Sequence, residues 1–298
     1  MVDPTRRLPP ALVATAREYA EGRREPVEPR FASTVVLLRA GRAAEPGGLE
    51  LYLLRRHVGM EFAAGMSVFP GGGVDKRDFD GDVGWAGPPP AEWARRLGVD
   101  EATARALVCA AVRETFEESG VLLAGPSADE VVADTTGADW EADRVALEGS
   151  GLSFTEFLAA RGLVIRTDLL GVTTGWQTPV FEPRRYRTWF FVAELPEGQR
   201  TRDVSTESDG VAWWTLRDAI TAVDAGEMLM LPPTYSTCLE LYDARTPHEA
   251  LLASQGPVTE MIEPQVVFDG DSAYLTAPDR LVALRAEVAQ RMAERLRS

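Results

Sequence analysis

Apolar and polar residues follow two periods along this chain, and the two periods separate expected strands from expected helices. Alternation every second residue, or a short run of Val and Leu, is typical of a strand, whereas apolar positions three and four apart are typical of a helix. Strands are expected over residues 31–40, 49–56, 168–176, 187–195, 211–214, 258–268 and 272–276. Helices are expected over residues 11–24, 91–98, 101–119, 215–226, 231–244 and 278–297.

The strands and helices alternate without a break in composition, and the sequence shows no repeat, low-complexity tract or linker. We therefore expect one α/β domain over residues 31–245, with a helical N-terminal extension (1–30) and a C-terminal appendage (246–298) packed on the same domain. The strands 31–40 and 49–56 should form a hairpin around the turn AAEPGG. Residues 62–74 predict a short strand and a glycine-rich turn, and residues 125–150 predict a loop with small helical pieces.

The charge balance narrows the class of partner. Lys and Arg number 31 against 46 Asp and Glu, which gives a formal net charge of −15. Nucleic acids and anionic membranes bind basic surfaces, so neither is an expected partner, and no run of 18 apolar residues predicts a transmembrane helix. Only two cysteines, no secretory signal pattern and a terminal Leu-Arg-Ser in place of Ser-Lys-Leu lead us to expect a cytoplasmic protein.

Residue counts exclude several kinds of chemistry. The only histidines, His57 and His248, are too few for a multi-histidine metal site, and a Ser-His-Asp triad is disfavoured. The motifs G-x-S-x-G, G-x-G-x-x-G and Walker A are absent. Acidic residues are abundant, so metal chemistry carried by carboxylates is the route that remains.

The helix expected over 101–119 is the clearest element, because Asp100 can cap its start and Gly120 can end it. Successive side chains on a helix are about 100° apart, so three carboxylates fall within about 100° of arc on the side opposite Phe116. These carboxylates are Glu114, Glu117 and Glu118.

Two interpretations of this acidic face are open. It could be a solvated surface on which Arg113 pairs with Glu117 four residues on. It could instead bind Mg²⁺ or Mn²⁺, since hard cations take oxygen ligands and would relieve the repulsion among the carboxylates.

Together with the glycine turn at residues 70–73, the helix resembles the Nudix hydrolase signature, G-x5-E-x7-R-E-U-x-E-E-x-G-U, where U is a bulky apolar residue. Its first Gly is matched by Gly72, and its second half by Arg113, Glu114, Glu117, Glu118, Gly120 and Val121. Asp78 occupies the position of the first Glu, and Thr115 occupies that of the first U, so the sequence departs from the signature at both positions. Between Asp78 and Arg113 lie 34 residues in place of seven, so an insertion of 27 residues occupies positions 79–105.

A signature split in this way is similar to that of the peroxisomal coenzyme A diphosphatase branch of the Nudix family. The strings FAAGMSVFPGG, CAAVRETFEESGVLL and LPPTYSTCLEL also resemble that branch, so the similarity covers roughly residues 31–245. The resemblance implies an α/β/α sandwich with a mixed sheet. In this chain the sandwich would have an insertion within the signature and an extra C-terminal segment.

The resemblance also implies roles for individual residues. Glu114, Glu117 and Glu118 would ligate Mg²⁺ or Mn²⁺, and Arg113 would orient one of these glutamates. The main chain at Gly71 and Gly72 would approach the ions and substrate closely. The catalytic base would be Glu117 or Glu207, which lies in the loop STESDG and could equally be an ordinary surface residue.

Three arginines, Arg184, Arg185 and Arg187, form a basic cluster in this acidic chain. They could bind substrate phosphates, such as a 3′-phosphate on coenzyme A, because arginine suits bidentate phosphate contacts. They could equally pair with some of the surplus carboxylates.

The function that the resemblance implies is metal-dependent cleavage of coenzyme A or acyl-coenzyme A to 4′-phosphopantetheine, or its acyl form, and adenosine 3′,5′-bisphosphate. One alternative is a Nudix hydrolase of ADP-ribose, of dinucleotides such as NADH, or of nucleoside triphosphates. Another is a catalytically silent Nudix domain that binds a ligand. The expected partner is a small nucleoside diphosphate-type substrate, and a homodimer is left open.

Overall fold

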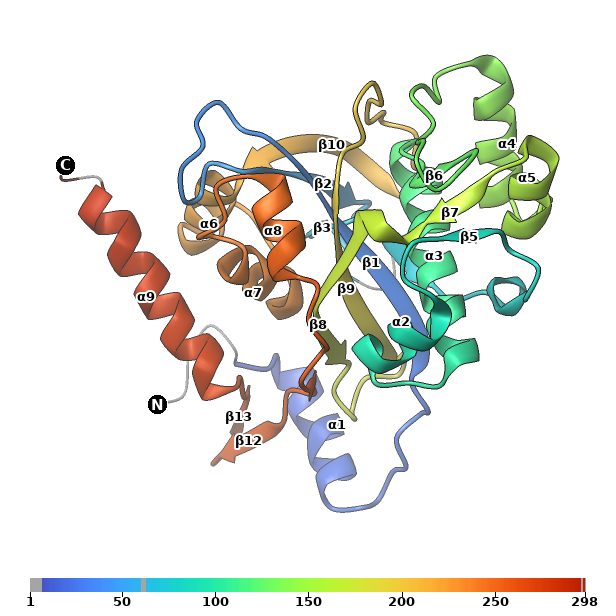
Figure 1. The fold of residues 1–298 in the computed structure, drawn as a ribbon. Coiled ribbons are helices and arrows are strands. Elements are labelled where there is room, and N and C mark those ends of the chain that lie inside the picture. Colours follow the sequence, from blue (N-terminus) through green and yellow to red (C-terminus); the bar gives the residue numbers. More distant parts are fainter. Residues whose placement is uncertain (1–6, 60–62, 296, 298) are drawn as a thin grey trace. The chain divides into compact units, whose positions relative to one another are not determined.

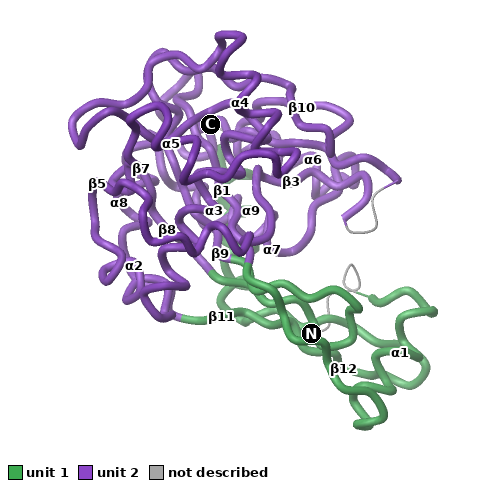
Figure 2. The backbone as a smooth tube through the Cα atoms, turned by 90° about the vertical axis from the view of Figure 1, so that its right-hand side faces the viewer, with its two compact units in different colours: residues 1–31, 175–188, 260–298 green, residues 32–174, 189–259 purple. Residues whose placement is uncertain are grey.

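The computed structural model describes residues 7–59, 63–295 and 297 (Figure 1). Residues 1–6 of the expected extension, residue 62 of the turn segment and residue 296 of the last expected helix lie outside the described residues. The backbone divides into two units (Figure 2). We call residues 32–174 and 189–259 the sheet unit, and residues 1–31, 175–188 and 260–298 the terminal unit. The expected C-terminal boundary at 246 differs from the unit boundary at 260.

The sheet unit is built on strands that lie in the order β10, β2, β1, β9, β8. Their bounds are Arg30–Arg39 for β1, Glu50–Arg56 for β2, Leu170–Gln177 for β8, Tyr186–Glu194 for β9 and Ser208–Thr215 for β10. Strands β1 and β2 are antiparallel, which confirms the expected hairpin. The short strands β3 (Ser67–Val68) and β4 (Gly71–Gly73) pair with β2 and β1.

Helices cover both faces of this sheet. The central residues 35–38 of β1 are fully buried, and a strand buried on both faces needs cover on both sides. Figure 1 shows α2 (Pro90–Leu97) and α3 (Glu101–Ser119) on one side, and α6 (Leu216–Asp224), α7 (Pro232–Glu240) and α8 (Pro247–Ala253) on the other. The Ser33 hydroxyl of β1 donates a 2.7 Å hydrogen bond to the carbonyl oxygen of Leu107, which fixes α3 against the sheet. This is the predicted α/β/α arrangement.

The insertion at 79–105 folds as part of the sheet unit. It contains β5 (Trp85–Ala86) and α2, and it ends within the first turns of α3. Strand β5 pairs in parallel with β7 (Val164–Arg166), which pairs antiparallel with β6 (Ala124–Gly125). The insertion therefore joins a small sheet with the segment that follows the signature.

The segment after α3 is more helical than its polar sequence suggests. Residues 138–148 form one continuous helix, α4 (Ala138–Glu148), where only small helical pieces within a loop were predicted. The side chains of Arg144 and Leu147 are buried, so packing stabilises a helix that local propensity leaves marginal. A second helix, α5 (Phe154–Arg161), follows, and the 3₁₀ helices η2 (Lys76–Phe79) and η3 (Thr167–Leu169) complete the connections.

The terminal unit combines both ends of the chain. It holds α1 (Pro10–Ala20), the antiparallel strands β12 (Val266–Asp269) and β13 (Ser272–Leu275), and α9 (Asp279–Arg295). Its core consists of Leu8, Val13, Ala16, Phe181 and Ala273. Strand β11 (Met261–Ile262) runs parallel to the end of β8, so the sheet is mixed, as predicted. Among the described residues, no helix combines the length and apolar character needed to span a membrane.

Candidate active site

Helix α3 carries the glutamates and has the predicted ends. The Asp100 carboxylate accepts a hydrogen bond from the backbone N–H of Thr103 at 3.0 Å, which caps the first turn. Gly120 ends the helix with φ 74°, a left-handed conformation that glycine adopts at low cost. The bounds Glu101–Ser119 therefore confirm the expected helix, and the three glutamates lie in its last two turns.

The glycine turn lies directly against these glutamates. Strand β4 pairs with β1, with Gly72 opposite Ser33. The Gly71 N–H donates a 2.7 Å hydrogen bond to Glu118 Oε2. A Cβ atom on Gly72 would lie 2.5 Å from Glu114 Oε1, so a larger residue would displace that carboxylate. The two halves of the signature, separated by the insertion in sequence, are in contact in the fold.

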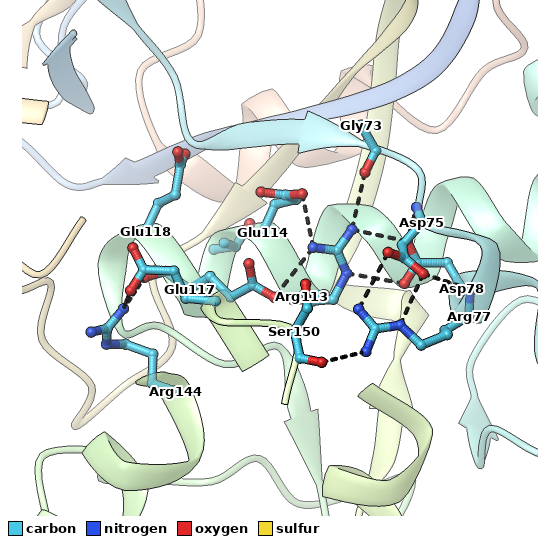
Figure 3. A network of polar contacts seen from close by, with 12 residues as sticks. Gly73, Asp75, Arg77, Asp78, Arg113, Glu114, Glu117, Glu118, Arg144 and Ser150 are labelled. Carbon is cyan, nitrogen blue, oxygen red and sulfur yellow. Dashed lines mark hydrogen bonds and ion pairs between the residues drawn. The ribbon is translucent and has the colours of Figure 1, made fainter. Parts of the chain in front are cut away.

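Arg113 connects these groups through its guanidinium (Figure 3). Its Nε and Nη2 donate to the two oxygens of Asp78 at 3.0 and 2.9 Å, a bidentate pair. Its Nη1 donates to Glu114 Oε1 at 2.8 Å and to Glu117 Oε1 at 3.2 Å. Its Nη2 also donates to the carbonyl oxygen of Gly73 at 3.1 Å. One side chain thus fixes the turn and the helix relative to each other.

Asp78 reaches Arg113 because the start of η2 holds it in place. The Asp75 carboxylate accepts a hydrogen bond from the Arg77 N–H, and Asp78 accepts one from the Asp75 N–H, each at 2.8 Å. This reciprocal capping leaves Asp78 only 2% exposed. The residue that replaces the first glutamate of the signature therefore still pairs with the signature arginine.

Burial distinguishes between the two interpretations of the acidic face. The Arg113–Glu117 pair of the first interpretation is present, but its side chains are only 12% and 9% exposed. Glu114 is similarly enclosed, at 13%. A solvated acidic surface would leave these carboxylates in water, whereas here they are enclosed and need positive charge or hydrogen bonds.

The enclosed carboxylates have strongly perturbed acidities. Burial raises the pKa of Glu114 to about 7 against the opposing attraction of Arg113. Burial, and then repulsion from Glu114, raises the pKa of Glu118 well above its ordinary value, while the Gly71 N–H acts in the opposite direction. Burial also raises the pKa of Glu117. A cation placed among these groups would favour their charged forms.

The carboxylate oxygens of Glu114, Glu117 and Glu118 are ligands of the type that a hard divalent cation binds. Across residues 7–59, 63–295 and 297, no three His, Cys, Asp or Glu side chains stand in an arrangement that could hold a metal ion. Carboxylates are nevertheless the ligands that Mg²⁺ and Mn²⁺ prefer, and Glu114 is close enough to Glu117 and to Glu118 for repulsion that a cation would relieve. Metal ligation by Glu114, Glu117 and Glu118 stays a prediction.

Glu207 lies in the loop before β10, with its side chain 53% exposed and its carboxylate 3.0 Å from Arg56 Nη2. After burial and Glu114, the charge of Glu207 also raises the pKa of Glu118, so Glu207 is within electrostatic reach of α3. Its exposure also suits a surface loop residue, and its role as a base stays a prediction.

The three predicted phosphate-binding arginines belong to the terminal unit. Arg185 is buried and forms a 2.6 Å ion pair with Glu263. It also donates to the carbonyl oxygens of Thr178 and Val27, each at 3.0 Å. Arg187 donates to the side-chain oxygen of Gln177 at 2.9 Å. Arg185 therefore pairs with one of the surplus carboxylates, which was the alternative expectation. Phosphate binding by this cluster stays a prediction.

Arg144 of α4 is one contributor to this site that the sequence analysis missed. Its side chain is nearly fully buried, and its Nη1 donates to the carbonyl oxygen of Glu117 at 2.7 Å. Glu141 and Glu148, three residues before and four after, pair with it at 2.8 and 3.0 Å. This spacing predicts pairs along one helix, but it carries no signal of the contact with α3.

The glycine turn, Arg113 and the glutamate-bearing helix are in contact, on an α/β/α sandwich, as the resemblance to the Nudix signature implies. The family described as the NUDT19 Nudix domain matches residues 98–241, which is just under half of the chain. This part of the chain is therefore similar to Nudix hydrolases.

Individual relatives agree with this assignment. The acyl-coenzyme A diphosphatase NUDT19 of Gallus gallus is 27% identical over 67% of this chain and 65% of that protein. The protein of the same name from Xenopus laevis is 24% identical over 62% of this chain and 58% of that protein. The chain thus spans less than two thirds of the length of these relatives. The crystal structure of a Nudix hydrolase from Alicyclobacillus acidocaldarius matches with a TM-score of 0.62 and 26% identity, covering 78% of this chain and 99% of that one.

Proposed function

We propose that this chain is a divalent-metal-dependent diphosphatase of coenzyme A or acyl-coenzyme A. It would release 4′-phosphopantetheine, or its acyl form, and adenosine 3′,5′-bisphosphate. The observation that carries the proposal is the contact of the glycine turn with Glu114 and Glu118 across the insertion. Similarity to the acyl-coenzyme A diphosphatases of Gallus gallus and Xenopus laevis supports the substrate class.

The residues of this site have distinct parts in the proposed reaction. Glu114, Glu117 and Glu118 would hold Mg²⁺ or Mn²⁺, which when bound neutralises the diphosphate and lowers the pKa of a water molecule. Arg113 keeps the carboxylates of Glu114 and Glu117 oriented through its Nη1. Glu117 and Glu207 are the candidates to accept the proton of the attacking water.

Turnover of a substrate panel tests the proposal. Coenzyme A, acetyl-coenzyme A, ADP-ribose, NADH and deoxynucleoside triphosphates should each be incubated with Mg²⁺ or Mn²⁺ and the products identified by mass. A coenzyme A thioester or free coenzyme A is expected to give the highest kcat/KM. Glu117→Gln and Glu118→Gln should abolish hydrolysis without unfolding the protein, whereas Glu101→Gln, at an exposed position of the same helix, should not.

The other outcomes are equally informative. Hydrolysis of ADP-ribose, NADH or a triphosphate, without cleavage of coenzyme A, would refute the proposed substrate and retain the Nudix chemistry. Binding without hydrolysis of any compound would identify a ligand-binding Nudix domain. Activity that survives both glutamine substitutions would refute the assignment of the site.

A further inference from the structure

Outside the signature, a polar network connects the C-terminal end of α3 with the loop that carries Glu207. The Nη1 atom of Arg144 donates a 2.7 Å hydrogen bond to the carbonyl oxygen of Glu117 (Figure 3). The same nitrogen is 3.0 Å from Glu148 Oε2. The other oxygen of Glu148 accepts hydrogen bonds from the backbone N–H and the hydroxyl of Thr206, at 3.1 and 2.7 Å. We call Arg144, Glu148 and Thr206 the Arg144 network.

The network is buried at Arg144 and exposed at Thr206. The Arg144 guanidinium is buried, and its remaining donors are paired with Glu141 at 2.8 and 3.0 Å. A cation at the C-terminal end of α3 interacts favourably with the helix dipole and with the carbonyl groups exposed there. Hydrogen bonds between charged partners, such as Arg144 and Glu148, are shorter and stronger than neutral ones. The network therefore restrains α3 and the loop together.

The Glu148–Thr206 contact adds a restraint to the loop that carries Glu207. The Glu207 side chain is about half exposed, and its carboxylate pairs with Arg56 in a partly solvated position. An exposed carboxylate on a loop is held weakly by its own contacts. On one side of the loop the Glu207 carbonyl oxygen accepts a 3.1 Å hydrogen bond from the His57 N–H, and on the other side Glu148 accepts hydrogen bonds from the N–H and the hydroxyl of the neighbouring Thr206.

We propose that Arg144 and Glu148 are positioning residues that fix Glu207 relative to Glu117. The inference rests on the proposed function, because it assigns both glutamates to one reaction. Arg144 contacts the backbone of Glu117, and Glu148 contacts Thr206, so the two residues act through these neighbours. Nothing in the Nudix signature specifies either residue, since both lie in α4.

A double-mutant cycle tests whether Glu148 acts through Glu207. Glu148→Ala should lower kcat about 10- to 100-fold with little change in KM, as removal of supporting contacts around a metal site commonly does. In a Glu207→Gln background, the same substitution should have little further effect. Asp143→Ala is the matched control, because it breaks a 2.6 Å ion pair of the same helix with Arg161, away from Thr206. This control should retain wild-type kcat.

Hydrogen exchange supplies a readout that needs no activity. The Thr206 amide should exchange faster in Glu148→Ala than in the wild type, and at the wild-type rate in Asp143→Ala. Unchanged exchange at Thr206, or equal losses of kcat in both backgrounds of the cycle, would overturn the positioning role. Wild-type kcat in Glu207→Gln would overturn it as well. A wild-type protein that hydrolyses no member of the substrate panel would instead overturn the proposed function, while the exchange result would still test the contact of Glu148 with Thr206.

Discussion

At the scale of single residues, the glycine turn can lie against Glu114 because Gly72 carries no side chain. A Cβ atom at Gly72 would lie 2.5 Å from Glu114 Oε1, while one at Gly73 would meet no atom within 4 Å. Gly72→Ala should therefore displace the Glu114 carboxylate, and a shift of about 1 Å at a catalytic group can cost about 100-fold in rate. Steady-state kinetics should show this loss for Gly72→Ala and near wild-type rates for Gly73→Ala. Equal activities of the two variants would contradict the contact.

The raised pKa of Glu114 gives a prediction about pH and stability. Its pKa is about 7 in the folded protein against an ordinary value of 4.5, so between these values the folded state binds more protons than the unfolded state. Its contribution to folding stability therefore falls as pH rises through this window. Glu114→Gln removes the titrating group and should become more stable relative to the wild type between pH 5 and pH 8.

Thermal unfolding in the presence of a chelator measures this difference. Glu101→Gln, exposed on the same helix, is the control and should follow the wild type across the pH range. A stability difference between Glu114→Gln and the wild type that stays constant with pH would show that the Glu114 carboxyl has an ordinary pKa.

At the scale of elements, the ion pair of Arg113 with Asp78 joins η2 to α3 across the insertion. Asp78 is 2% exposed, so Asp78→Ala would leave part of a buried guanidinium unpaired. Loss of one partner of a buried pair costs about 3–5 kcal/mol, and the remaining contacts of Arg113 place the expected loss near the lower end. Denaturant unfolding should show it, whereas Asp80→Ala, at an exposed neighbouring position, should have little effect. Similar unfolding midpoints for the two variants would contradict the linking role.

The elements that the sequence predicts are those with local signals. Helix α3 has a capping aspartate and a terminal glycine, and both of its ends were predicted from them. Helix α5 has comparable signals, a capping box of Ser153 with Glu156 and a terminal Gly162, although no helix was predicted there. The strands β5 and β6 have two residues each, and their pairing with β7 is a tertiary contact without a periodic pattern.

The same distinction applies to the site. The glutamates, Arg113 and the glycine turn follow a motif, so their proximity was predictable despite the insertion. The contact of Arg144 with Glu117 was not, because it depends on how α4 packs against the end of α3. The two partners of Arg144 on its own helix gave no sign of this third contact. Arg144 was missed because its contact with Glu117 arises from long-range packing and has no local sequence pattern.

At the scale of the whole molecule, the signature belongs entirely to the sheet unit, whereas the predicted phosphate-binding arginines belong to the terminal unit. Each unit has its own core, and the burial of Arg185 against Glu263 shows that part of the basic cluster stabilises the terminal unit. The residues proposed for the chemistry and those predicted to bind substrate phosphates therefore belong to different units.

The proposed metal binding would link the site to the stability of the whole chain. The unfolded chain does not gather Glu114 and Glu118, so a divalent ion held by these residues would bind the folded state and stabilise it by about 2.7 kcal/mol at 100 times its dissociation constant. Salt also raises the Tm of a protein with a net charge of −15, because it screens repulsion. Thermal unfolding should therefore compare MnCl2 with NaCl at equal ionic strength. The wild type should gain several degrees more in MnCl2, and the Glu114→Gln, Glu118→Gln double variant should gain equally in both salts. An excess in MnCl2 that persists in the double variant would place the stabilising ion elsewhere.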